Sequence, residues 1–247
     1  MTTSALGALV RAETRQLRRS PAALIFAIGL PLLAIIVMAL IPGARAPREA
    51  FGGLSVIEAF TAPIIMVSVT VICVMSMPQT IGTHRESGFL RRLRTTPVPP
   101  ATVLAASLVV HAVLALAMPC AVLAVTLLAG GRAPAHPVLL AGTIVLMSIT
   151  FLAIGAVLCA VIPNVRVLSG AGNVVAILMW FSAGLWIPRA VMPDWARTLT
   201  DLTPGGASAE LLNTAMAGGQ GDWLDLLVCL AWTVLALAVA VRSFRWE

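Results

Sequence analysis

The sequence predicts an all-α integral membrane protein with six transmembrane helices, an N-terminal amphipathic helix, a short cytoplasmic helix and short external helices before the last span. Of the 247 residues 60% are hydrophobic and only 11% are charged, and the mean hydropathy is +1.00, whereas about a quarter of a soluble domain is charged. The apolar residues form runs near the ~20 residues that cross a ~30 Å hydrocarbon core. The arginines lie mainly between these runs.

Residues 1–21 predict an amphipathic helix on the cytoplasmic surface, because apolar and basic side chains recur there near helical spacing. The apolar positions are Leu6, Leu9, Val10 and Leu17, and the basic positions are Arg11, Arg15, Arg18 and Arg19. Residues 22–41 form the first predicted span, which Pro31 is expected to bend. A cleaved signal peptide is the alternative, since residues 44–46 resemble a cleavage site, but the apolar run exceeds the usual ~7–15 residues.

The other predicted spans are residues 60–80, 101–129, 138–161, 167–186 and 223–241. The third is longer than one crossing needs and contains Pro119, so it is expected to be tilted or kinked. His111 in this span is either a functional ionisable group or a neutral side chain bonded to a backbone carbonyl, and we favour the structural role. The small residues 169–172, with Asn173 beside them, predict a close helix contact, within the chain or across a dimer seam.

The external segment 188–222 is predicted to contain two short helices, one after Pro193-Asp194 and one over residues 207–217. Neither is long enough to cross a membrane, so both are expected to be interfacial or re-entrant. Six spans place both termini on one side of the membrane. The excess of arginine in the segments on that side predicts that it is the cytoplasmic side of the cell membrane. The segments on that side hold eleven arginines: Arg11, Arg15, Arg18, Arg19, Arg85, Arg91, Arg92, Arg94, Arg166, Arg242 and Arg245; the others hold five: Arg45, Arg48, Arg132, Arg189 and Arg197.

Residues 83–97, which read THRESGFLRRLRTTP, are predicted to form a short cytoplasmic helix along the membrane face. Thr83 and Glu86 have the spacing of a capping box, and Pro97 disfavours helix at the preceding residue. Phe89, Leu90 and Leu93 would lie on one face, which could dock in a groove on a partner protein. A solvated loop whose arginines only set the topology is the alternative.

Several chemistries are excluded by the residues present. All 16 basic residues are Arg, so the chain has no lysine for a Walker A phosphate loop. The four cysteines lie in apolar runs without metal-ligand spacing, no hydrolase motif occurs, and no Asp, Glu or Lys lies in an apolar core to couple ions. The arginine distribution explains the net charge of +6 by topology, so no nucleic acid partner is expected. A transporter, channel or scaffold that takes its energy from another polypeptide remains.

Residues 85–97, after the second predicted span, resemble the signature of ABC-2 type exporter permeases, including daunorubicin-resistance and related actinobacterial multidrug permeases. The resemblance covers essentially the whole chain, since the basic N-terminus, this loop and the proline-bounded segment before the last span occur in the family's order. The chain lacks a large external domain, which disfavours sterol-type and macrolide-type relatives. The resemblance implies that residues 1–247 form one ABC-2 type transmembrane domain.

The resemblance also implies partners and site residues. A separate ABC ATPase subunit would bind ATP and Mg and dock on residues 83–97 as the coupling helix, and a second permease subunit would complete a homodimer or heterodimer in the lipid membrane. The implied coupling residues are Arg85, Glu86, Gly88, Leu90, Arg91, Arg92, Leu93 and Pro97, and the residues on the expected substrate path are Asn173, Met179, Trp180 and Ser182. Residues 188–222 would be outer gate helices.

On this reading the chain is not itself an enzyme and binds no cofactor or metal. It would export a small hydrophobic drug, antibiotic or lipid-like molecule. The alternative is a nucleotide-independent membrane channel or scaffold.

Overall fold

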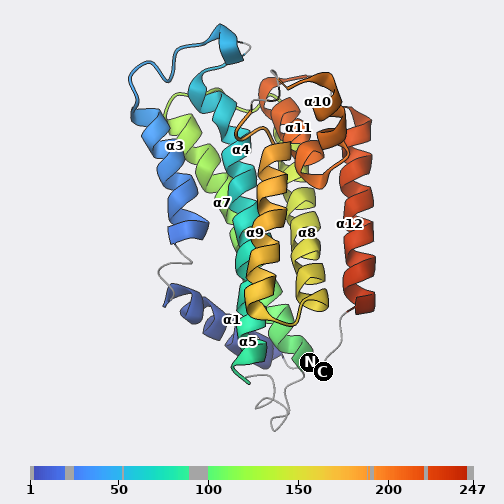
Figure 1. The fold of residues 1–247 in the computed structure, drawn as a ribbon. Coiled ribbons are helices and arrows are strands. Elements are labelled where there is room, and N and C mark those ends of the chain that lie inside the picture. Colours follow the sequence, from blue (N-terminus) through green and yellow to red (C-terminus); the bar gives the residue numbers. More distant parts are fainter. Residues whose placement is uncertain are drawn as a thin grey trace.

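The computed structural model describes residues 3–19, 25–51, 53–88, 100–187, 189, 192–219 and 222–243. These residues form a bundle of long helices that run side by side, with α1 across one end and α10 and α11 at the other end (Figure 1). The described ranges contain no β-strand. In chain order the helical segments are α1 (Thr3–Arg18), the π-helical turn η1 (Ile25–Gly29), α3 (Leu30–Leu40), the 3-10 turn η2 (Glu49–Phe51), α4 (Val56–Thr70), the π-helical segment η3 (Val71–Ser76), α5 (Met77–Glu86), α7 (Pro100–Leu128), α8 (Pro137–Val161), α9 (Val165–Ser182), α10 (Asp194–Asp201), α11 (Pro204–Ala217) and α12 (Trp223–Ser243).

Among the described residues, five helices are long and apolar enough to cross a membrane, and a shorter apolar helix spans Ala27–Leu40. The prediction of an all-α membrane protein is therefore confirmed. The third predicted span is one uninterrupted helix through Pro119. In the first predicted span, η1 directly precedes Pro31 at the start of α3.

The second span is the central helix of the bundle. It is a single helical span, Val56–Glu86, in which α4, η3 and α5 follow one another without a break, and 78% of its most apolar stretch is buried. The corresponding fractions for α9 and α12 are 28% each. The outward faces of these surrounding helices are apolar, as at Leu178 and Val234, because hydrocarbon is their solvent.

A π-helical segment interrupts this central helix just before Pro78. Proline has no backbone N–H and its ring crowds the carbonyl of the residue four positions earlier, which is Val74, so a regular helix is disfavoured here. The widened backbone needs room on its neighbours, and glycine provides it. A β-carbon on Gly155 of α8 would overlap the carbonyl oxygen of Cys73, and one on Gly172 of α9 would lie 2.9 Å from that of Val74.

Candidate functional site

The predicted start of a separate helix at Thr83 is wrong. Thr83 lies inside α5, where its hydroxyl donates to the carbonyl of Gln79 at 2.8 Å instead of capping a helix. The helix of the second span continues to Glu86 and ends where Gly88 takes a φ of +66°, a left-handed conformation that favours glycine. Tertiary contacts on both sides extend the span beyond the apolar run, which ends near residue 80.

Most of the predicted coupling segment lies outside the described residues, which resume at Pro100. The implied coupling residues in this part of the chain are Leu90, Arg91, Arg92, Leu93 and Pro97, together with Phe89 and Arg94 on the predicted helix. The structure does describe Arg85, Glu86 and Gly88. These three lie at the end of α5, from which the segment departs.

His84 joins the end of α5 to α1. Its Nδ1 lies 3.5 Å from the Glu13 carboxylate, and its Nε2 lies 3.3 Å from the side-chain oxygen of Gln16. Glu13 and His84 are both buried. Burial raises the pKa of the Glu13 carboxyl to about 7, because it disfavours the charged form.

The contact between Glu13 and His84 changes one detail of the amphipathic helix predicted at the N-terminus. The helix is present as α1, and Arg11, Arg15 and Arg19 are exposed, as predicted. Its inner face is not purely apolar, however, because Glu13 lies there against α5. α1 also packs along α7, so the described part of the N-terminal segment is attached to the bundle by tertiary contacts.

Arg85 and Glu86 join the same end of α5 to the turn between α8 and α9. The Arg85 guanidinium donates to the carbonyl oxygen of Cys159 at 2.5 Å, in the last turn of α8. The Glu86 carboxylate accepts from the backbone N–H of Val165, the first residue of α9, at 3.1 Å. The Asn164 side chain accepts from the next two amides of α9, so together these acceptors satisfy amide donors that a helix N-terminus leaves without intrahelical partners.

A second polar cluster lies at the opposite end of the bundle, around Arg189. This buried guanidinium pairs with Asp201 of α10 and with Glu210 of α11, the latter at 3.1 Å. It also donates to the carbonyl of Ser182 at the end of α9, at 2.8 Å. One arginine thereby ties α9, α10 and α11 together. Its position between Trp186 and the next helix gave no periodic signal in the sequence.

The two short external helices that the sequence predicts are present, as α10 and α11. The second begins at Pro204, before the predicted start, because the Thr203 hydroxyl accepts from the Gly206 amide and caps the helix. α11 lies against α8, α9 and α12. A β-carbon on Gly205 would lie 2.9 Å from the carbonyl oxygen of Met179, so glycine permits close approach of α11 to α9.

The four residues expected on the substrate path do not lie together. Met179 and Ser182 face the interior of the bundle, where Met179 contacts α11 and the Ser182 carbonyl accepts from Arg189. Asn173 is exposed on the outward side of α9. The Trp180 ring lies 6.3 Å from that of Trp186, and its buried indole N–H has no hydrogen-bond partner among the described residues.

Two alternatives left open by the sequence have structural answers. His111 is buried in α7, with Nδ1 2.8 Å from the carbonyl of Ser107 and Nε2 3.4 Å from the Ser76 hydroxyl. This geometry fits the structural role. The small residues of α9 differ in their surroundings. Gly172 packs on η3 within the chain, whereas a β-carbon on Gly170 would meet open space.

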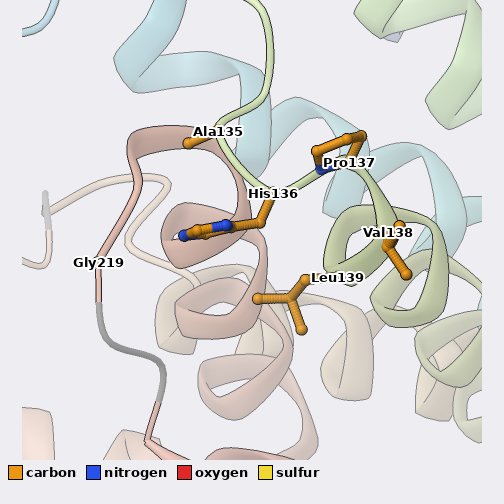
Figure 2. A pocket seen from close by; sticks show the side chains of 6 residues that line it. All are labelled: Ala135, His136, Pro137, Val138, Leu139 and Gly219. Atoms are coloured by element: carbon orange, nitrogen blue, oxygen red, sulfur yellow. The ribbon is translucent and has the colours of Figure 1, made fainter.

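A shallow depression of about 480 Å³ lies between the α7–α8 connection and the segment after α11 (Figure 2). Two backbone amides of this connection donate to the carbonyls of Ala215 and Met216 near the end of α11. The depression is open and is lined mostly by exposed residues away from α9. Its lining residues are Ala135, His136, Pro137, Val138, Leu139 and Gly219.

The fold and its two polar clusters define a multi-pass helical membrane protein with a separate tertiary junction at each end of the bundle. Comparison with known sequences specifies its family. The ABC-2 type transporter family matches residues 4–216, and the chain belongs to this family, as its sequence pattern predicts. A Bacillus subtilis (strain 168) protein named "Putative transport permease YvfS" is 27% identical over 192 residues, which cover 71% of this chain and 74% of that protein.

Family membership establishes the coarse function. The chain is a membrane permease of an ABC transporter, and the family context includes an ATPase partner. Family members are transmembrane transport subunits that generally lack an ATPase site of their own.

Proposed function

We propose that this chain is the membrane-spanning subunit of an ATP-driven exporter, which moves a hydrophobic drug, antibiotic or lipid-like molecule from the cytoplasm or inner leaflet to the outside. The observation that carries the proposal is the position of Arg85, Glu86 and Gly88, the described start of the arginine-rich segment, at the end of α5. These residues end the most buried helix among the described spans. A partner that displaced this segment would therefore act on the core helix, which contacts α7, α8 and α9.

The proposed motor is a separate ATPase subunit that binds ATP and Mg and docks on residues 83–97. In this assignment the coupling element comprises the last turn of α5 and the segment after Gly88. Closure of the ATPase dimer would shift the permease between inward-facing and outward-facing states, which requires that ATP favour one state over the other. A second permease subunit, identical or homologous, would complete the transporter.

The proposed orientation places α1, the end of α5 and the end of α12 on the cytoplasmic side of the cell membrane. Figure 1 supports a common side, because these three ends lie at the same end of the bundle. Arg11, Arg15 and Arg242 are exposed there, as expected for cytoplasmic segments. The helices α10 and α11 would then form the outer gate, and export would proceed past α9.

The test is reconstitution of the complex purified with its native partner. We expect a co-purifying subunit with a phosphate-binding loop, and ATP-dependent accumulation of a fluorescent hydrophobic drug inside inverted vesicles. Glu86→Arg should uncouple ATPase activity from this accumulation while the protein stays in the membrane. Conductance or drug movement without nucleotide would instead favour the channel or scaffold alternative, and full drug-stimulated ATPase activity in Glu86→Arg would contradict the coupling assignment.

A further inference from the structure

We propose that His84, Arg85 and Glu86 form a three-way positioning junction that makes α1 and the α8–α9 pair move with the end of α5. The inference rests on the proposed function, because it concerns how motion imposed by an ATPase spreads through this chain. None of the three residues is assigned a role in substrate binding. Each is proposed to act by holding another element in place.

Three consecutive side chains contact three different elements. His84 meets Gln16 of α1, Arg85 meets Cys159 of α8, and Glu86 meets Val165 of α9. These partners are 68, 74 and 79 residues away in sequence. Successive side chains on a helix point about 100° apart, so three consecutive positions can reach neighbours on three sides of the helix end.

The charges at the junction complement the helices that they touch. Arg85 lies at the C-terminal end of α8, where exposed carbonyls carry partial negative charge, and Glu86 lies at the N-terminal end of α9, where amides carry partial positive charge. Hydrogen bonds to ionised groups are about twice as strong as those between neutral groups. The turn between these helices contains only residues 162–164, so both of its ends are fixed to α5.

A continuous set of contacts leads from this junction to the opposite end of the bundle. Glu86 holds the first residue of α9, and Met179 near the other end of α9 contacts Gly205 of α11. The end of α9 is also bonded to Arg189, which pairs with α10 and α11. Displacement of the end of α5 would thus reach the external helices through α9. Spatial continuity alone does not demonstrate coupling, so the proposal is tested by removal of one bond.

The decisive substitution is Val165→Pro, because it removes the amide donor and leaves Glu86 free for any contact with a partner. Val165 is the first residue of α9, where proline is favoured. Asn164 before it has φ −84° and ψ 123°, which is compatible with a following proline. The matched control is Val165→Ala, which trims the same side chain but keeps the donor.

The readout is a reporter cysteine at the other end of the bundle. Leu199→Cys places a thiol on exposed α10, and Cys120→Ser removes the exposed native cysteine from the described part of the chain. Maleimide labelling is measured on the reconstituted complex with its ATPase, with and without ATP plus vanadate. We expect a nucleotide-dependent change in labelling rate in the parent and in Val165→Ala, and a change at least threefold smaller in Val165→Pro at an unaltered ATPase rate.

The outcomes separate the junction from the proposed function. If the parent shows no nucleotide-dependent labelling change, the ATPase does not drive this chain and the proposed function is overturned. If the parent responds and Val165→Pro responds equally, the junction is overturned while the exporter assignment stands. Arg85→Ala is the second arm in case the proline variant does not assemble, because loss of its bond to the Cys159 carbonyl should reduce the same response, and an undiminished response would again contradict the proposal.

Discussion

The α-carbon of Gly155 in α8 lies so close to the carbonyl of Cys73 in η3 that a β-carbon at this position would overlap the carbonyl oxygen. The contact explains how the bundle tolerates a π-helical segment in its most buried helix. Bulged carbonyls that would clash with any larger residue meet glycine on α8, and Gly172 has the corresponding position on α9. Packing between these helices therefore depends on residues without side chains.

The first prediction concerns Gly155→Ala, with Gly142→Ala as the matched control in the same helix. The added methyl group of Gly155→Ala must displace backbone, and we expect a loss of about 1–3 kcal/mol, as for other overpacked cores. A β-carbon on Gly142 meets no atom within 4 Å, so Gly142→Ala should gain up to ~1 kcal/mol from helix propensity. Thermal unfolding of the purified protein in detergent measures both, and equal midpoints would contradict the packing account.

The second prediction concerns the buried Arg189. Arg189→Met would remove the buried cation between Asp201 and Glu210. Loss of one partner costs about 3–5 kcal/mol in a fully buried pair, and we expect a smaller loss here, because the two carboxylate side chains are 31% and 28% exposed and Glu210 keeps its contact with Arg197. Arg197→Met is the control, because Arg197 is 48% exposed and pairs with the same Glu210 at 3.5 Å, and exposed pairs contribute about 0–1 kcal/mol. We expect Arg189→Met to lower the thermal midpoint and to make α10 accessible to protease. A midpoint no lower than that of Arg197→Met would show that Arg189 does not hold α10 and α11 in place.

The third prediction concerns pH and α1. Because burial raises the pKa of Glu13 to about 7, docking favours the neutral carboxyl. The stability that the neutral Glu13 carboxyl contributes to the docking of α1 is fully present below the ordinary pKa of about 4.5. It is lost as the pH rises through 7. A fluorophore on Ala12→Cys, an exposed position of α1, should therefore show higher anisotropy at pH 5 than at pH 8.

The control for this titration is Glu13→Gln, which keeps the shape of the side chain and cannot ionise. The substitution leaves the other two side chains of this contact unchanged, namely His84, which faces Glu13, and Gln16, which faces His84. We expect a flatter pH profile in this variant. An unchanged profile would assign the pH dependence to another group.

The fourth prediction concerns the point at which the coupling segment leaves α5. Gly88→Ala places a β-carbon on a residue with φ +66°, which costs roughly 1–2 kcal/mol in a left-handed conformation. The chain should relieve this strain by changing the direction of the following segment, and drug-stimulated ATPase activity of the complex should fall. Gly88→Asn is the control, since asparagine tolerates this conformation. Loss of activity in both variants to the same extent would exclude backbone direction as the cause.

Much of the architecture could be predicted because the relevant signals are local. A hydrocarbon core requires a fixed length of apolar chain, so composition and run length predict the spans, and proline and glycine predict the two external helices. The arginine-rich motif after the second span, together with the order of the segments around it, indicated the family, which the family match confirms. These inferences use neighbours within one or two helical turns.

The tertiary structure decided where Thr83 lies, which residues Glu86 and Arg189 contact, and how the candidate path residues are distributed around α9. A capping-box pattern at Thr83 is equally compatible with a residue in mid-helix, and contacts with α1, α8 and α9 extend α5 past it. Partners 74 or 79 residues apart leave no periodic trace, because helix periodicity records only which face is apolar. The pairing of helix ends follows from the packing of all helices at once, so only the folded chain determines it.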